Sequence, residues 1–170
     1  MKLRSLALGL VLAASSFVAS AAAFTVVLQP TTPDHLTASF GDTPVLGSFT
    51  DVFTFTPSLN PGSSASAYFF NFSLDGHGAV DPNLQILFTA ADLNGNPFAI
   101  NNSIPFTQAG VYVPTTGGPL VLTVSGVSGG GSYSGVINVT MAPVPEPATY
   151  GMLAGGLALL GVVARRKRLS

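Results

Sequence analysis

The stretch GSFTDVFTFTP, residues 47–57, indicates the fold class of this 170-residue chain. Phe alternates in it with Thr and Val, which is the pattern of a β-strand. Because side chains alternate between the two faces of a strand, one face is expected to carry Phe49, Asp51, Phe53 and Phe55. The carboxylate in this aromatic row needs an explanation, since burying it without a hydrogen bond or an opposite charge costs several kcal/mol.

Residues 24–143 are predicted to form one all-β domain, an antiparallel β-sandwich of the jelly-roll or immunoglobulin-like type. Turn-forming clusters such as PSLNPGSS at 57–64 separate its short segments, and Asn94-Gly95 predicts a tight hairpin turn. The strand candidates are Phe24–Gln29, His35–Phe40, Gly47–Thr56, Ala67–Leu74, Leu84–Thr89, Pro97–Ile100, Gly110–Val113, Leu120–Ser125 and Tyr133–Met141.

The segment Ala67–Leu74 carries two alternating rows of side chains. Tyr68, Phe70, Phe72 and Leu74 form the more hydrophobic row, which is therefore expected to face the core. Phe69 then stands as the one aromatic residue on the polar-facing side. This assignment leaves little aromatic surface for stacking on sugars.

The charged residues are unevenly placed and exclude some classes of partner. All six Lys and Arg residues lie outside Ser5–Ala164, whereas all seven Asp and Glu residues lie inside it. A domain without cations cannot hold phosphates by releasing counterions, so nucleic acid is not an expected partner. A buried carboxylate cannot pair with Lys or Arg there either. The chain has no cysteine, which excludes disulfides and thiol chemistry.

The N-terminus has the three parts of a secretory signal peptide, predicted to be a helix over residues 1–23. Lys2 and Arg4 supply the positive region, and residues 6–18 are apolar. Small residues follow, with Ala21 and Ala23 at the expected cleavage site for signal peptidase. The sequence therefore predicts an exported chain.

The C-terminus has a different organisation. Residues 148–164 carry no charge, and this length is at the short limit for crossing a bilayer. The basic residues that follow are Arg165, Arg166, Lys167 and Arg168, which the positive-inside rule places in the cytoplasm. A transmembrane helix, with the membrane as a partner, is therefore predicted here.

Residues 144–170 resemble the PEP-CTERM sorting signal, in which Pro-Glu-Pro precedes an apolar helix and a basic tail. Pro145, Glu146 and Pro147 occupy the motif positions, and the resemblance implies that they are recognised by exosortase, a membrane-embedded transpeptidase-like enzyme. Such proteins belong to bacteria that make exopolysaccharide. The implied route passes transiently through the inner membrane to the cell envelope or extracellular matrix.

A second resemblance involves the opening stretch. Phe49, Asp51 and Phe53 match the name-giving pattern of the FxDxF family of PEP-CTERM proteins. That family has no assigned biochemical activity, so the resemblance implies a location and not a chemistry.

One candidate catalytic motif is rejected on its surroundings. GVSGG at residues 126–130 matches the Gly-x-Ser-x-Gly nucleophile pattern, which works on a strand-to-helix turn and needs an acid and a histidine. No histidine follows Ser128, and the segment after it reads as another strand. The glycines are therefore predicted to form a hairpin loop, and no enzyme activity is expected.

Three interpretations of Asp51 remain open. The carboxylate can lie on a sheet edge and face water, accept hydrogen bonds from backbone N–H groups of a neighbouring loop, or bind calcium together with other Asp residues. Apart from that calcium ion, no metal or cofactor is expected.

These observations predict a non-enzymatic structural or adhesive protein of the cell envelope or extracellular matrix. The alternative is a carbohydrate-binding module for exopolysaccharide, the possible partner of the mature domain.

Overall fold

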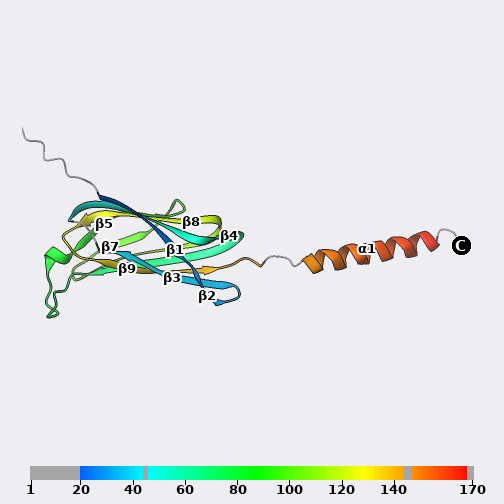
Figure 1. The fold of residues 1–170 in the computed structure, drawn as a ribbon, viewed down its shortest axis with the longest axis horizontal. Helices are drawn as coiled ribbons and strands as arrows, with labels where there is room; N and C mark the ends of the chain where they lie inside the picture. Colours follow the sequence, from blue (N-terminus) through cyan, green and yellow to red (C-terminus); the bar gives the residue numbers. More distant parts are fainter. Residues whose placement is uncertain (1–19, 44–45, 144–146, 168–170) are drawn as a thin grey trace, which may run out of the picture.

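The computed structural model describes residues 20–43, 46–143 and 147–167 (Figure 1). The strands are β1 Ser20–Val27, β2 Gln29–Thr32, β3 His35–Asp42, β4 Gly47–Phe72, β5 Ile86–Leu93, β6 Asn96–Pro97, β7 Ala99–Asn102, β8 Phe106–Ser128 and β9 Tyr133–Thr140. A short 3₁₀ helix, η1, covers Pro82–Leu84, and one α-helix, α1, covers Pro147–Lys167. The all-β prediction for the domain is confirmed.

All nine strands belong to one sheet. Its order is β2-β3-β9-β4-β8-β5-β6, with β1 paired to β4 and β7 paired to β8. Neighbours are antiparallel except β1 and β4, which run parallel. The Asn94-Gly95 turn joins β5 to β6, which confirms the predicted hairpin, and φ is positive at both residues.

The predicted sandwich of two sheets is not confirmed, because two long strands keep the sheet continuous. β4 has 26 residues and β8 has 23, and they pair from Gly47–Ser128 to Phe72–Phe106. The expected turn at 57–64 lies inside β4, where pairing becomes irregular between Phe55 and Ala65. Prolines in this stretch lack the N–H group needed for the ladder, so the strand is disturbed without ending.

The two halves of β4 have different neighbours and share one core. β1 flanks Phe49–Thr56, whereas β9 flanks Ser64–Phe70. The Phe40 ring from β3 lies 5.2 Å from Phe53 in the first half and 6.2 Å from Phe69 in the second half, measured between ring centroids. Side chains from both halves therefore pack together.

The prediction for the faces of Ala67–Leu74 is wrong. Phe69 is fully buried, whereas Tyr68 and Phe72 are 41% and 53% exposed. The buried row consists of Ala65, Ala67, Phe69 and Asn71 in the second half of β4, and of Ser73 directly after the strand. Phe69 is held inside by Phe88, whose ring centroid lies 4.8 Å away at an interplanar angle of 80°. Because side chains alternate with a period of two, assigning one residue of a strand to the wrong face places all the others on the wrong face as well.

Helix α1 forms over 21 residues, from Pro147 to Lys167. Proline suits the first helical position, where its missing N–H has no intrahelical partner to lose. Within the described residues, however, no helix combines the length and apolar character needed to cross a bilayer. The predicted transmembrane helix is therefore not supported. Eight of residues 148–164 are Gly or Ala, which contribute little apolar surface.

Strand β1 overlaps the predicted signal peptide. Its register runs from Ser20 opposite Phe49 to Val27 opposite Thr56. The expected boundary after Ala23 therefore falls in the middle of a strand, and residues 20–23 are not helical. Residues 1–19 of the predicted signal helix lie outside the described residues.

Candidate functional site

Asp51 lies in the interior of the sheet. Its register neighbours are Ala22 on β1 and Val124 on β8, and the residue is only 2% exposed. Flanking strands on both sides and near-complete burial show that the interpretation of Asp51 as a water-facing edge residue is wrong.

The carboxylate is hydrogen-bonded to a distant tyrosine. The Tyr133 hydroxyl, at the start of β9, donates to Asp51 Oδ2 at 2.6 Å. Of the three interpretations, the pinned carboxylate fits best, but the groups that hold Asp51 are the Tyr133 hydroxyl and the backbone of Ala22 in strand β1, and not N–H groups of a loop. The bond ties the first residue of β9 to the first half of β4, 82 positions away in the chain.

Aromatic rings from β4 and β5 surround the ring of Tyr133. The rings of Phe49 and Tyr133 stack with centroids 5.9 Å apart and an interplanar angle of 24°, and Phe53 meets the Tyr133 ring edge-on at 6.4 Å. Phe69 and Phe88 contact the same ring at 5.9 and 5.6 Å. The motif residues Phe49, Asp51 and Phe53 thus all contact one tyrosine.

Burial shifts the ionisation of both partners. Loss of solvent raises the pKa of the Asp51 carboxyl, the Tyr133 hydrogen bond partly lowers it, and the negative charge of Asp42 raises it. Burial, and then the hydrogen bond and charge of Asp51, raise the pKa of Tyr133. Tyr133 therefore remains a protonated donor at physiological pH.

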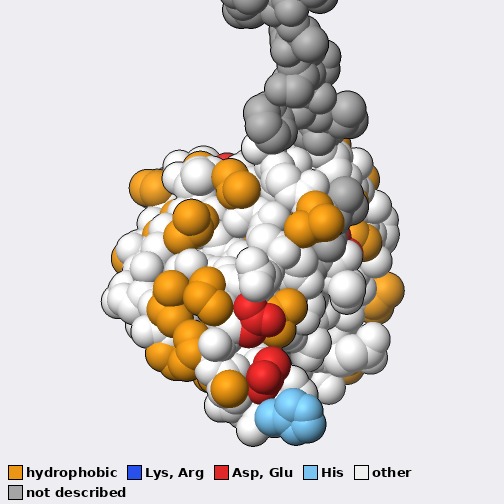
Figure 2. All heavy atoms as spheres, turned by 90° about the vertical axis from the view of Figure 1, so that its left-hand side faces the viewer, with side chains coloured by type: hydrophobic (Ala, Val, Ile, Leu, Met, Phe, Trp, Pro, Cys, Tyr) orange, Lys and Arg blue, Asp and Glu red, His pale blue; other side chains and the backbone are white. Residues whose placement is uncertain are grey.

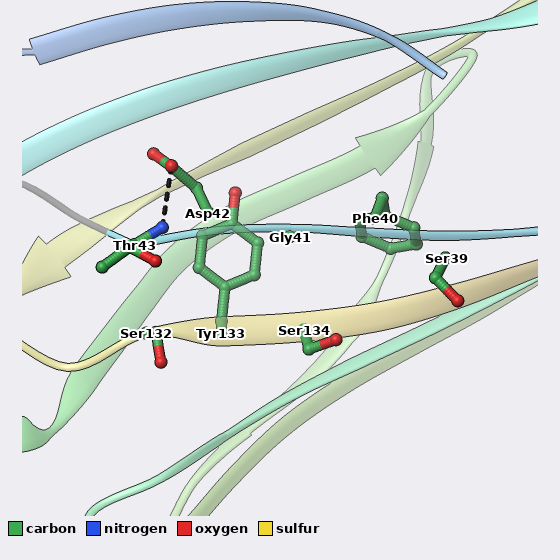
Figure 3. Close-up of a pocket in the computed structure, with 8 residues that line it drawn as sticks. All are labelled: Ser39, Phe40, Gly41, Asp42, Thr43, Ser132, Tyr133 and Ser134. Atoms are coloured by element: carbon green, nitrogen blue, oxygen red, sulfur yellow. Dashed lines mark hydrogen bonds between the residues drawn. The ribbon is translucent and has the colours of Figure 1, made fainter. Parts of the chain in front are cut away.

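An open hollow of about 520 Å³ lies above this tyrosine, along the junction of β3 and β9 (Figure 3). Its lining residues are Ser39, Phe40, Gly41, Asp42, Thr43, Ser132, Tyr133 and Ser134. Asp42 Oδ1 accepts a hydrogen bond from the Thr43 backbone N–H at 2.7 Å. Hydroxyl groups and one carboxylate can hydrogen-bond a polar molecule, but this lining offers no histidine to act as a base.

The strands approach each other closely at this hollow because of Gly41. A Cβ atom at this position would lie 2.4 Å from the Tyr133 carbonyl oxygen. Any side chain would therefore push β3 away from the residue that binds Asp51.

The calcium interpretation of Asp51 lacks a ligand set. Among the described residues, no group of three or more His, Cys, Asp or Glu side chains is placed to hold a metal ion.

Asn71 is another buried polar residue, and it is not among the predicted site residues. Its amide donates to the carbonyls of Ser132 and Leu84 at 2.8 and 3.1 Å, and its Oδ1 accepts from the Ile86 N–H at 3.0 Å. These bonds hold the segment before β9 against the start of β5. The only local sign was an Asn in a hydrophobic strand.

The GVSGG segment is not a hairpin, contrary to prediction. β8 pairs with β4, β5 and β7, whereas β9 pairs with β3 and β4, so the loop crosses between strands that are not neighbours. The Ser128 side chain is buried, and its Oγ accepts the Gly130 N–H at 3.0 Å. The element that follows is a strand and not the helix of a nucleophile turn.

The second half of β4 and the first part of β8 present a group of exposed and half-buried aromatic residues, here called the outer aromatic face. Its members are Tyr68, Phe70, Phe72, Phe106 and Tyr112. The Phe72 ring lies 5.3 Å from Phe70 and 4.8 Å from Phe106, between centroids. In the end view of Figure 2, hydrophobic side chains are spread over the described surface and are densest at the lower left, and no Lys or Arg is visible on the described surface in view.

The predicted sorting residues are only partly described. Pro147 begins α1, and Arg165, Arg166 and Lys167 occupy its last turn. Pro145, Glu146 and Arg168 lie outside the described residues. At the other end, Ala21 and Ala23 lie in β1, opposite Thr50 and Val52. The roles assigned to these residues stay predictions.

Comparison with known proteins identifies the tail. Residues 143–168 match the PEP-CTERM protein-sorting motif, which confirms the resemblance predicted for 144–170. The motif implies sorting by exosortase to the cell surface. The match does not extend to Phe49–Phe53, so the FxDxF family is not shown. No curated protein matches the chain.

Proposed function

We propose that this protein is an exported, non-enzymatic structural or adhesive component that exosortase sorts to the cell surface or extracellular matrix. The observation that carries the proposal is the sorting motif at residues 143–168, placed directly after the β domain, which ends at Thr140 in β9.

Features at the N-terminus support export. A positive region, an apolar run and small residues are arranged as in a signal peptide. The absence of cysteine means that folding outside the cytoplasm requires no disulfide.

The contacts of the polar core support a structural role for the domain. The Asp51 carboxylate accepts a hydrogen bond from Tyr133, and the Asn71 side-chain amide is hydrogen-bonded to backbone groups. These residues stabilise the packing and are closed to a substrate. Membership of the FxDxF family is part of this proposal and rests on the match of Phe49, Asp51 and Phe53 to its pattern. In the fold these three residues form one packing unit around Tyr133.

Intact mass of the protein from the native host tests the sorting. The expected chain begins near Phe24 and ends near residues 145–147. An otherwise identical host without exosortase should retain the tail through Ser170, and Glu146→Gln should reduce processing in the wild-type host. A surface form that still carries residues 165–170 in the wild-type host would overturn the proposed sorting.

A further inference from the structure

The register of β4 defines which residues share the outer aromatic face. Residues directly opposite each other in an antiparallel pair point to the same side of the sheet. Tyr68 stands opposite Gly110 and Val136, Phe70 opposite Gln108 and Ser134, Phe72 opposite Phe106, and Ser66 opposite Tyr112 and Asn138. The face therefore extends across β9, β4 and β8.

The aromatic rings of this face are accessible. Tyr112 is 67% exposed, Phe72 is 53% exposed, and Phe70 and Phe106 are half-buried. From Ser66 to Phe72 the strand rises about 20 Å, at roughly 3.3 Å per residue. Contiguous exposed apolar groups on a protein surface are typical of interaction sites.

Gly110 positions the central ring. A Cβ atom there would lie 3.3 Å from Tyr68 Cδ2, so the ring lies against the strand where Gly110 has no side chain. The Tyr68 hydroxyl donates a hydrogen bond to Gln108 Oε1, which orients both groups. The ring and the amide are thus held before any ligand binds.

Hydrogen-bonding groups border the rings. On β9, Ser134 and Asn138 are exposed, and Asn138 Oδ1 accepts a hydrogen bond from Thr37 on β3 at 3.0 Å. None of the residues in these registers of β4, β8 and β9 is Asp, Glu, Lys or Arg. The surface therefore combines aromatic faces with hydroxyl and amide groups and carries no charge.

We infer that the outer aromatic face binds an uncharged polysaccharide. Sugar rings present C–H faces that pack on aromatic rings, and their hydroxyls exchange hydrogen bonds with amides such as Gln108 and Asn138. An anionic polymer would find no cation on this face. The inference deepens the proposed adhesive function, on which it rests, by naming the class of partner.

A second copy of the chain fits this face less well. Pairing two such faces would bury Gln108, Ser134 and Asn138 against aromatic rings, and each unsatisfied polar group costs free energy. A polyhydroxylated ligand satisfies the same groups.

Affinity electrophoresis of the protein purified from the native host tests the inference, with gels containing cellulose-type β-glucan, dextran, mannan or the anionic polymer alginate. At least one neutral polymer should retard the wild type, and alginate should not. Phe72→Ala and Tyr112→Ala should each weaken binding about tenfold, as expected for loss of one stacking ring and its buried area. The matched control is Leu87→Ala, because Leu87 is also exposed, at 44%, but lies on β5.

Unchanged circular dichroism and melting of the variants will show that they fold. Binding that survives both aromatic substitutions, retardation by alginate alone, or no retardation by any neutral polymer overturns the inference. A dimer in sedimentation that dissociates in Phe72→Ala, without glycan binding, would assign the face to a second copy. These outcomes are independent of tail processing, so failure of sorting and failure of binding are distinguishable.

Discussion

The two halves of β4 carry similar aromatic rows with opposite orientations. In the first half, Phe49, Phe53 and Phe55 point into the core. In the second half, Tyr68, Phe70 and Phe72 point outward, and the buried row contains alanines, Phe69 and two polar residues. Alternation therefore separates the two faces of a strand but does not determine which face is buried. In the second half, the more hydrophobic row is the exposed one.

The largest expected effect comes from removing one ring from each face of the second half of β4, in two separate variants. Phe69→Ala should destabilise the protein by about 3–5 kcal/mol, since it leaves a cavity among buried rings. Phe72→Ala should cost less than about 1 kcal/mol, because its ring is already half in water. Urea unfolding followed by circular dichroism measures both. Equal effects, or the reverse order, would show that the faces are assigned wrongly.

Tyr133→Phe tests the polar contact of the first half. The variant keeps the stacked ring but removes the hydroxyl that donates to Asp51, leaving a buried carboxylate without its partner. We expect a loss of about 1–3 kcal/mol at neutral pH. Adding Asp51→Asn to this variant should recover part of the loss, because an amide carries no charge to desolvate. Unfolding curves of the single and double variants give the coupling, and additive effects would contradict the pairing.

Gly41→Ala tests how closely β3 approaches β9 at Tyr133, whose ring packs against both halves of β4. The new Cβ would meet the Tyr133 carbonyl oxygen at 2.4 Å, so β3 must shift, with an expected cost of about 1–3 kcal/mol. Gly76→Ala is the matched control, since no atom lies within 4 Å of a Cβ at that position. Thermal melting compares the two, and a Gly41→Ala protein as stable as the control would contradict the close approach.

The smallest expected effect is a pH dependence from Asp51. Its pKa is raised in the folded state, mainly by burial. The contribution of this carboxyl to stability is therefore full below its unfolded pKa and decreases as pH rises through the higher folded pKa. The Asp51→Asn variant has no such titration, so its melting temperature should rise relative to wild type between acidic and neutral pH.

Melting scans across this pH range check the prediction, and parallel profiles for the two proteins would contradict it. Added calcium is expected to leave both profiles unchanged, because the carboxylate is occupied by Tyr133.

Local chemistry made several features predictable. Alternating Phe, Thr and Val indicated strands, Asn94-Gly95 indicated a tight turn with positive φ, and Pro145–Pro147 with the basic tail indicated sorting. These signals depend on the conformational preferences of neighbouring residues, or on a motif that is contiguous in the chain, so each can be interpreted without knowing the fold.

Long-range contacts were not predictable in the same way. The partner of Asp51 is 82 residues away, and nothing near Tyr133 distinguishes it from the other three tyrosines. The glycines at 126–130 predicted a hairpin loop because they favour a turn, yet residues 126–128 belong to β8, and β8 and β9 are not neighbours in the sheet. The pairing of strands depends on which side chains pack together across the whole fold, and the glycine content of one segment does not determine it.

Composition and local pattern were thus sufficient to establish an all-β domain with few charges and a C-terminal sorting tail. The tertiary structure was needed to show that Phe69 lies inside and Tyr68 outside, that β4 and β8 unite the strands in one sheet, and that Tyr133 donates a hydrogen bond which offsets part of the cost of burying Asp51. The physical reason is that backbone geometry sets the period of a strand locally, whereas burial depends on the side chains that distant strands bring to each face.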